Sequence, residues 1–276
     1  MKKIGVIGTG NMGTILIEAW LEADILEPAD LIITNRTLSK AAALKEKHHG
    51  IQLATSTAEL IQKADLIFLC VKPLQIHSLL QDIKHHIKKE QVLISITSPL
   101  SVAQLEAEVE GPCARFIPSI TNRVGSGVSL LSFSEKCTDE MRKLLHDLAS
   151  SISEPIIIEN DITRVASDIV SCGPAFFSFL AQAFIEGAVD TTKIDKKTAT
   201  TLTGNMLIGL GELLGKGIYT LPTLQEKVCV KGGITGEGIK VLEAETGEMF
   251  HHLFHATHEK FAEDLEEVEK QFGHPY

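Results

Sequence analysis

The sequence lacks a surplus of positive charge. Its 36 aspartates and glutamates outnumber its 26 lysines and arginines, and the formal net charge of the 276 residues is −10. Binding to nucleic-acid phosphates requires an excess of lysine and arginine, so this balance argues against a nucleic-acid partner. For the same reason it argues against binding to an anionic membrane surface.

We also expect no disulfide-forming cysteine pairs, no leader segment and no hydrophobic run long enough to span a membrane. Its five cysteines are scattered and form no Cys-x-x-Cys pair, which is typical of a reduced cytoplasmic protein. The apolar run after Lys2-Lys3 is too short for a signal peptide. No apolar stretch reaches the length of a membrane span. We therefore expect a cytoplasmic protein that does not enter a membrane.

What the sequence does have is a glycine pattern near its start. The apolar run 4–7 predicts a buried strand, the motif Gly8-x-Gly10-x-x-Gly13 follows it, and an amphipathic helix is expected over 14–23. In a dinucleotide-binding turn the first glycine makes the tight turn, the second lets the backbone approach a pyrophosphate, and the third lets the helix pack against the strand. The alternative is a glycine-rich turn that holds no ligand.

The residues after the second expected strand, 31–34, bear on which dinucleotide would bind. NAD-preferring sites carry an acidic residue here for the ribose 2′-hydroxyl, but this chain has Asn35, Arg36 and Thr37. The Arg36 guanidinium is suited to a 2′-phosphate, so we expect NADPH to be preferred over NADH. In the alternative, Thr37 only caps the helix expected over 38–47 and Arg36 is solvated.

Strands and helices alternate through the first half of the chain. Further strands are expected at 52–54, 65–71, 91–96, 113–117, 128–133 and 155–158, with helices opening near Ser56, Ser101 and Thr138. This order predicts a Rossmann-type α/β fold with a doubly wound parallel sheet. After residue 160 only helices are expected, over 162–170, 175–190, 196–215, 224–228, 238–244 and 248–272. We therefore expect two domains, a dinucleotide-binding domain over 1–159 and an all-helical dimerisation and substrate domain over 160–276.

The helical half contains a very apolar helix and a glycine-rich turn. The helix over 175–185 is too apolar to have one solvated face, so it is expected in a helical core or against a second subunit. The turn 230–238 places four glycines around Thr235. Free N–H groups at the start of the following helix would form a cradle for a substrate carboxylate. The alternative is a flexible linker.

The last helix carries four histidines, His251, His252, His255 and His258. Three of them share one helix face, at spacings of four and three residues, and this pattern invites a metal site. No acidic or cysteine ligand completes it. We therefore interpret this face as exposed and expect no bound metal.

Several motifs together resemble a known family. Their order is similar to that of pyrroline-5-carboxylate reductases: Gly8-x-Gly10-Asn11-Met12-Gly13, Val71-Lys72-Pro73, Ser171-Cys172-Gly173-Pro174-Ala175-Phe176 and Lys231-Gly232-Gly233-Ile234-Thr235. The resemblance covers nearly the whole chain, and segments 118–122 and 228–233 resemble the late-competence branch of the family. It implies a Rossmann domain, a helical domain that forms homodimers or larger homo-oligomers, and hydride transfer from NAD(P)H to the C=N bond of 1-pyrroline-5-carboxylate, giving L-proline.

The resemblance also implies which residues form the site. The cofactor-binding residues would be Gly8, Thr9, Gly10, Asn11, Met12, Gly13, Asn35, Arg36, Thr37, Val71, Lys72, Pro73, Thr97 and Ser98. The substrate-binding residues would be Ser171, Lys231, Gly232, Gly233, Ile234 and Thr235. Thr235 would be the catalytic residue, because its hydroxyl would lie near the imine nitrogen. Since the cofactor carries the hydride, the reaction needs neither a Ser-His-Asp set nor a metal.

The chain departs from the family pattern on the substrate side. The departures lie at 97–99, at 117–121, at Val230-Lys231 and at Phe176, where the family usually has tyrosine. They motivate a second hypothesis, an NADP(H)-binding paralogue with an altered substrate or a regulatory role and without efficient turnover. A third hypothesis is a relative of β-hydroxyacid dehydrogenases with Lys216 as the catalytic lysine, although Lys216 is expected at a helix end.

Overall fold

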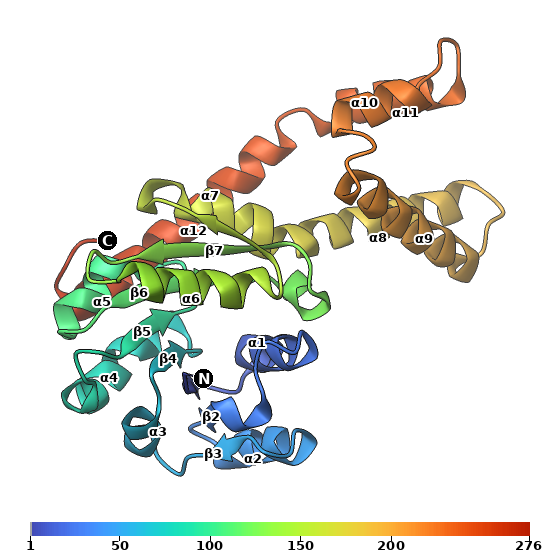
Figure 1. Cartoon of the computed structure of the whole chain (residues 1–276). Coiled ribbons are helices and arrows are strands. Elements are labelled where there is room, and N and C mark those ends of the chain that lie inside the picture. Colours follow the sequence, from blue (N-terminus) through green and yellow to red (C-terminus); the bar gives the residue numbers. More distant parts are fainter. Residues whose placement is uncertain (1) are drawn as a thin grey trace. The chain divides into compact units, whose positions relative to one another are not determined.

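The computed structural model describes residues 2–276. Its contacts divide the chain into two compact units, which are coloured along the sequence in Figure 1. Unit 1 comprises the chain up to Pro174 together with Ala256–Tyr276, and unit 2 comprises Ala175–His255. Residues 256–276 return to unit 1 through contacts with distant parts of the chain. The change from strands to helices near residue 160 does not predict this return.

Unit 1 is built on one eight-stranded sheet. The strands follow the order β3-β2-β1-β4-β5-β6-β7-β8. Their bounds are β1 Ile4–Ile7, β2 Leu31–Thr34, β3 Gln52–Leu53, β4 Leu66–Leu69, β5 Val92–Ser95, β6 Cys113–Ile117, β7 Val128–Phe133 and β8 Glu154–Ile157. All eight lie where the sequence predicts strands, and the Rossmann-type architecture is confirmed.

The sheet is mostly parallel, and the prediction of a parallel sheet needs a correction at one pair. β7 runs antiparallel to β6, with Arg115 opposite Ser132, and β8 then runs parallel to β7. A parallel return needs a crossover of about a dozen or more residues, usually through a helix. Residues 118–127 contain only the short 3-10 helix η3, Ile120–Val124, so the chain reverses direction there.

Helices cover both faces of the sheet. In unit 1 they are α1 Asn11–Glu22, α2 Leu38–Lys47, α3 Thr57–Lys63, α4 Pro73–Ile83, α5 Val102–Glu108, α6 Asp139–Ser150, α7 Thr163–Ser167 and the later part of α12, Met249–Phe272. Short turns lie between them: η1 Pro28–Asp30, η2 Lys84–His86, η4 Asn160–Ile162 and the π-helical η5 Asp168–Cys172. No helix is expected over 73–83 from the sequence, yet Pro73 opens α4 at its first helical position.

Two large hydrophobic clusters, one on each face of the sheet, form most of the core of unit 1, and a small third cluster contains Ile117, Leu130 and Ile158. Neighbouring residues of β4 belong to different clusters: Phe68 packs with residues of α1 and α6, and Ile67 packs with residues of α3, α4 and α5. A strand that is apolar on both faces is what a doubly wound sheet requires. Val268 and Phe272 of α12 join the second cluster, which anchors the end of α12 to unit 1.

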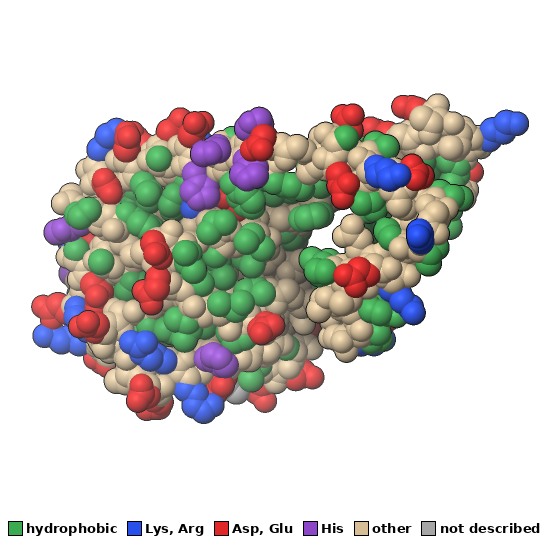
Figure 2. Space-filling model, turned by 90° about the horizontal axis from the view of Figure 1, so that it is seen from above, with side chains coloured by type: hydrophobic (Ala, Val, Ile, Leu, Met, Phe, Trp, Pro, Cys, Tyr) green, Lys and Arg blue, Asp and Glu red, His purple; other side chains and the backbone are tan. Residues whose placement is uncertain are grey.

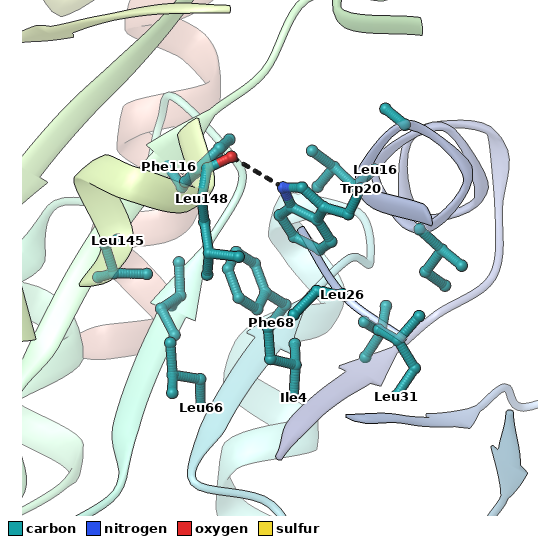
Figure 3. Packing of buried hydrophobic residues seen from close by; sticks show 14 of the residues in the cluster. Ile4, Leu16, Trp20, Leu26, Leu31, Leu66, Phe68, Phe116, Leu145 and Leu148 are labelled. Carbon is teal, nitrogen blue, oxygen red and sulfur yellow. Dashed lines mark hydrogen bonds between the residues drawn. The ribbon is translucent and has the colours of Figure 1, made fainter. Parts of the chain in front are cut away.

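Trp20, the only tryptophan of the chain, lies within the first cluster (Figure 3). Its ring centroid is 5.1 Å from that of Phe68 and 6.2 Å from that of Phe116, and both contacts are edge-on. Its indole N–H donates to the carbonyl oxygen of Leu148 at 3.0 Å. Trp20 thus fixes α1 to α6 while its ring stabilises the packing of α1 on the strands.

Unit 2 is helical. It contains most of α8, Gly173–Thr191, then α9 Lys196–Gly215, α10 Leu221–Val228, α11 Ile234–Thr246 and the start of α12. Many of its large apolar side chains are exposed, among them Phe177, Phe179 and Phe184. Figure 2 shows hydrophobic side chains on the surfaces of both units. The helices of unit 2 therefore do not bury all of their apolar faces within one chain.

One helical stretch, Asn160–Thr191, is long and apolar enough to cross a membrane, so the expectation that no stretch reaches this length is wrong. Within its most apolar segment, 17% of the residues are buried. Separate helices are expected over 162–170 and 175–190, whereas the helical backbone continues through Gly173 and Pro174. An apolar helix of this length either spans a bilayer or is covered by protein, so length and composition do not assign a membrane to the chain.

Candidate functional site

The candidate site begins where β1 and β4 end side by side. The winding of the sheet reverses between these strands, which is where open α/β sheets bind ligands. Gly8 follows β1 with φ +106°, and a Cβ on it would lie 2.4 Å from the carbonyl oxygen of Cys70. A Cβ on Gly13 would lie 2.1 Å from the carbonyl oxygen of Gly8. Close backbone contacts therefore require both glycines, as the fingerprint predicts.

The first turn of α1 leaves hydrogen-bond donors free for an anion. Gly10 is the N-cap residue without a side-chain bond, the first turn holds no acidic residue, and a Cβ on Gly10 would meet nothing within 4 Å. The Thr9 hydroxyl beside it is buried and has no hydrogen-bond partner. Unpaired N–H groups at the positive end of a helix dipole favour phosphate. The arrangement fits a dinucleotide pyrophosphate, which would also satisfy the Thr9 hydroxyl.

Asn35 links the glycine turn to the loop after β2. Its Oδ1 accepts the Thr9 N–H at 3.1 Å, and its Nδ2 donates to the carbonyl oxygen of Thr37 at 3.0 Å. Arg36 and Thr37 are exposed. Thr37 is the N-cap of α2 but makes no side-chain capping bond, so the structure does not favour the alternative in which Thr37 only caps the helix.

The other predicted cofactor segments lie at the same edge of the sheet. Val71, Lys72 and Pro73 connect β4 to α4, and Lys72 is the exposed N-cap of that helix. Thr97-Ser98 follow β5, where the Thr97 N–H donates to the Ser95 hydroxyl at 3.2 Å. Because β1, β2, β4 and β5 are parallel, their carboxyl ends meet at one edge. The structure thus brings all the predicted cofactor residues to one side of unit 1.

The loop after β6 is tied to the segment that carries Ser171. The Ser119 hydroxyl donates to the carbonyl oxygen of Val170 at 2.6 Å, and the Ser171 hydroxyl donates to that of Pro118 at 2.9 Å. Ser171 therefore uses its proton within unit 1 and keeps only acceptor capacity for a ligand. No sequence pattern indicates this reciprocal pair, because its partners lie 51 and 53 residues apart in the chain.

An ion pair joins the half-buried Arg164 of α7 to the buried Asp168 of η5, the short helix that also carries Ser171. The carboxylate of Asp168 accepts from Arg164 Nη2 at 2.8 Å and from the Thr257 hydroxyl of α12 at 2.7 Å.

Two cysteines near the candidate site have raised pKa values. Burial raises the pKa of the Cys172 thiol, and burial raises the pKa of the Cys70 thiol to about 12. Both cysteines therefore remain neutral thiols at neutral pH and are unsuited to nucleophilic chemistry.

The glycine-rich turn lies in unit 2 and opens α11. Gly232 has φ +75°, and Gly233 is the N-cap of α11 without a side-chain bond. α11 begins at Ile234, earlier than the predicted start at 238, so Thr235 lies in its first turn. Lys231 and Thr235 are exposed. This turn is a helix N-terminus rather than a linker. The Gly233 N–H donates to the Val230 carbonyl oxygen at 2.9 Å, and the N–H groups in the first turn of α11 are of the kind that bind carboxylates.

The remaining candidates do not form a second site. Within residues 2–276, no group of three or more His, Cys, Asp or Glu side chains is arranged for a metal ion. His251 Nδ1 of α12 lies 3.1 Å from the carboxylate of Glu248, the residue directly before that helix. Lys216 is the C-cap of α9 and pairs with Glu212 at 3.0 Å, so its position does not support the β-hydroxyacid dehydrogenase hypothesis.

Two protein-family models match the chain. Residues 3–99 match the model described as NADP oxidoreductase coenzyme F420-dependent. Residues 160–264 match the model described as pyrroline-5-carboxylate reductase dimerisation. The first match contains the glycine turn and the loops after β2, β4 and β5, and the second contains Ser171 and the glycine-rich turn of α11.

Comparisons with individual proteins extend over nearly the whole chain. ComE operon protein 4 of Bacillus subtilis is 51% identical over 270 residues, which cover 98% of this chain and 99% of that protein. Pyrroline-5-carboxylate reductase 3 of Bacillus subtilis is 29% identical over 272 residues, which cover 98% and 100%. The crystal structure of Plasmodium falciparum pyrroline carboxylate reductase with NADP bound shares the fold, with a TM-score of 0.80 and 23% identity over 98% of each chain. The chain therefore belongs to the pyrroline-5-carboxylate reductase family of NADP-dependent oxidoreductases.

Proposed function

We propose that this protein is an NADPH-dependent imine reductase that converts 1-pyrroline-5-carboxylate to L-proline. The observation that carries the proposal is the glycine turn, where the uncapped first turn of α1 and the unpartnered Thr9 hydroxyl fit a pyrophosphate. The substrate is supported by a relative that is named a pyrroline-5-carboxylate reductase and aligns with 98% of the chain.

In this proposal the cofactor lies along the carboxyl edge of the sheet. The turn 8–13 holds the pyrophosphate, and the loop 35–37 holds the 2′-phosphate, for which Arg36 provides a charge-assisted contact that NADH cannot use. Residues 71–73 and 97–98 line the remainder of the cofactor site. When bound, NADPH supplies the hydride.

The contribution of the chain to the reaction is binding and orientation of the substrate. Backbone N–H groups in the first turn of α11, beginning with Ile234, bind its carboxylate, and Lys231 adds a positive charge beside them. Gly233 shapes the turn, and its own N–H donates to the Val230 carbonyl oxygen. The substrate binds with its imine nitrogen protonated, so that this proton and the hydride together reduce the C=N bond. The Thr235 hydroxyl, in the first turn of α11, donates to the carboxylate and accepts from the imine N–H. The Ser171 hydroxyl donates its proton to the Pro118 carbonyl oxygen, so towards the substrate its oxygen acts as a hydrogen-bond acceptor.

We also propose that unit 2 forms the interface of a homodimer. Its exposed phenylalanines lie within the segment that matches the dimerisation model. A second copy would cover residues 175–191, the part of the apolar stretch that lies in unit 2, so this part is assigned to protein contacts rather than to a bilayer. Burial of such a surface is typical of permanent dimers.

A second candidate function is that of an NADP(H)-binding paralogue with another substrate or a regulatory role. Two observations favour it. Val230 and Lys231 depart from the family pattern directly before the paired glycines. A relative that is 51% identical is named for an operon rather than for a reaction. A role in competence would belong to this candidate.

One assay separates the two candidates. Purified protein is mixed with NADPH and 1-pyrroline-5-carboxylate, nicotinamide absorbance is followed, and the Kd for NADPH is measured in parallel. Turnover of about 1–1000 per second, the range of ordinary enzymes, supports the reductase. Tight NADPH binding without turnover contradicts the reductase and supports the paralogue. Failure to bind NADPH contradicts both.

Thr235→Val tests the assignment of the substrate turn. Loss of one hydrogen bond to a charged group should lower kcat/KM by about 10- to 100-fold and leave the Kd for NADPH unchanged. Thr246→Val, at the other end of α11, is the matched control. Loss of NADPH binding in Thr235→Val would show that the turn has another role.

A further inference from the structure

Arg115 is a buried arginine in the middle of β6. Its relative exposure is 1%. It pairs in the sheet with Ser95, the last residue of β5. A guanidinium is costly to bury and is normally compensated by a carboxylate.

The hydrogen-bond acceptors around Arg115 are all neutral. Nη1 donates to the Ser98 carbonyl oxygen at 3.2 Å and to the Tyr276 hydroxyl at 2.6 Å. Nη2 donates to three side chains: Ser132 Oγ at 3.3 Å, Asn160 Oδ1 at 3.0 Å and Thr163 Oγ1 at 2.7 Å. Ion pairing therefore does not explain why an arginine is buried at this position. Its planar fork instead joins the loop after β5, strand β7 and the segment η4–α7.

The Ser98 carbonyl is held by two donors at once. Besides Arg115 Nη1, the Tyr276 hydroxyl donates to it at 3.0 Å. Tyr276 is held in turn by its own N–H, which donates to Glu269 Oε1 at 3.0 Å, and by an edge-on contact with Phe261 at 5.8 Å. Arg115, Tyr276 and the Ser98 carbonyl thus form a closed triangle of hydrogen bonds.

The place of Ser98 in the sheet indicates which part of the cofactor it would meet. The 2′-phosphate loop follows β2, on one side of β1, and the loop with Ser98 follows β5, on the other side of β1. The pyrophosphate turn follows β1 itself. A dinucleotide laid across this edge with its adenosine at β2 therefore has its nicotinamide end towards β5.

We propose that Arg115 and Tyr276 are positioning residues that hold the loop after β5 in the conformation that receives the nicotinamide end of NADPH. The proposal rests on the assignment of this edge to the cofactor made under the proposed function. A loop fixed before binding loses less conformational freedom when the ligand arrives, which strengthens binding and aligns the reacting carbon. Neither residue contacts the cofactor in this proposal, because both act through Ser98.

Two ligands separate positioning from a general effect on stability. NADPH occupies the whole edge, whereas 2′,5′-ADP occupies only the part near β1 and β2. In Tyr276→Phe, which removes the hydroxyl alone, we expect the Kd for NADPH to rise by about fivefold and the Kd for 2′,5′-ADP to stay unchanged. Arg115→Lys keeps the positive charge but removes the planar guanidinium. It should raise the Kd for NADPH more than Tyr276→Phe does and also leave the Kd for 2′,5′-ADP unchanged.

Tyr219→Phe makes the same chemical change at the other tyrosine and serves as the control. The proposal is overturned if Tyr276→Phe leaves the Kd for NADPH unchanged, or weakens NADPH and 2′,5′-ADP equally. If Arg115→Lys does not fold, the Tyr276→Phe result decides. Wild-type protein that binds neither ligand would overturn the proposed function together with this inference, whereas wild-type protein that binds both isolates the role of Tyr276.

Discussion

At the residue scale, Gly8 and Gly10 are glycines for different physical reasons. Gly8 has φ +106°, and its Cβ would meet the Cys70 carbonyl oxygen at 2.4 Å. A Cβ on Gly10 would meet nothing within 4 Å. The fold therefore requires Gly8, whereas Gly10 is required only by a ligand that approaches the backbone.

A pair of alanine variants should show this difference. We predict that Gly8→Ala lowers the free energy of unfolding by about 1–3 kcal/mol, because the backbone strain remains in the folded state. Gly10→Ala should leave the free energy of unfolding unchanged and weaken NADPH binding by about tenfold or more, the effect of a steric clash with the ligand. Urea unfolding and NADPH titration measure both. An equal loss of stability in the two variants would contradict the distinction.

In the proposed function, the preference for NADPH over NADH depends on Arg36. Arg36→Ala removes a charge-assisted hydrogen bond to the 2′-phosphate, so the preference for NADPH over NADH should narrow by about 10- to 100-fold. The measurement is the ratio of the two Kd values. Lys45→Ala removes the same charge from the last turn of α2 and is the control. An unchanged ratio in Arg36→Ala would mean that the loop after β2 does not recognise the phosphate.

At the element scale, helix α1 is held by a charge cluster as well as by the glycine turn. Glu18 of α1 accepts from Lys47 Nζ at 2.5 Å and lies 3.4 Å from His48 Nε2 and from Arg123 Nε of η3. Burial opposes ionisation of Glu18, but hydrogen bonds from Lys47 and His48 outweigh it and lower the pKa of the carboxyl. One carboxylate thus joins α1 to the end of α2 and to η3.

The lowered pKa of Glu18 predicts a pH dependence. A carboxyl whose pKa is lower in the folded protein than its usual 4.5 stabilises the fold above that pH, and this contribution is lost as the pH falls below it. Glu18→Gln should lower the free energy of unfolding by about 1–3 kcal/mol at pH 7. The difference from wild type should shrink at pH 4.

Urea unfolding at both pH values makes the test. Glu46→Gln, on the exposed face of α2, should change little at either pH and serves as the control. A difference between wild type and Glu18→Gln that is the same at pH 7 and at pH 4 would mean that ionisation of Glu18 does not stabilise the fold.

For helices and strands with strong local sequence patterns, the first and last residues were predicted correctly. The bounds of β1, β2, α2, β6, β7 and α9 match the expected ranges, because apolar runs and capping residues are local features of the chain. Ser56 caps α3 as expected by accepting the Glu59 N–H. The direction of β7 could not be predicted in this way, because it depends on pairing between strands.

At the scale of the whole molecule, unit 2 is incomplete as a single chain. Phe179 of α8 is 70% exposed, and Phe177 and Phe184 are similarly exposed. Exposed apolar faces of this extent mark contact surfaces. The match of residues 160–264 to a dimerisation model supports a second copy of this chain as the partner.

Phe179→Asp should therefore disrupt the homodimer. A buried, unpaired charge at the interface costs several kcal/mol, enough to shift a micromolar sample towards monomer. Sedimentation velocity or light scattering after size exclusion measures the change. Ile157→Asp, on β8 and outside the dimerisation match, is the control. A wild-type monomer, or a Phe179→Asp variant that remains dimeric, would contradict the proposed interface.

The sequence alone was sufficient for the glycine turn, the strand order along the chain, the loop that lacks an acidic residue after β2 and the family, because these depend on residue types at short spacings. The structure was needed for the reversal at β7, the return of α12 to unit 1 and the neutral hydrogen-bond shell of Arg115. Arg115 and Tyr276 are 161 residues apart in the chain. Such contacts form only when the sheet and its covering helices are assembled, so no local sequence pattern predicts them.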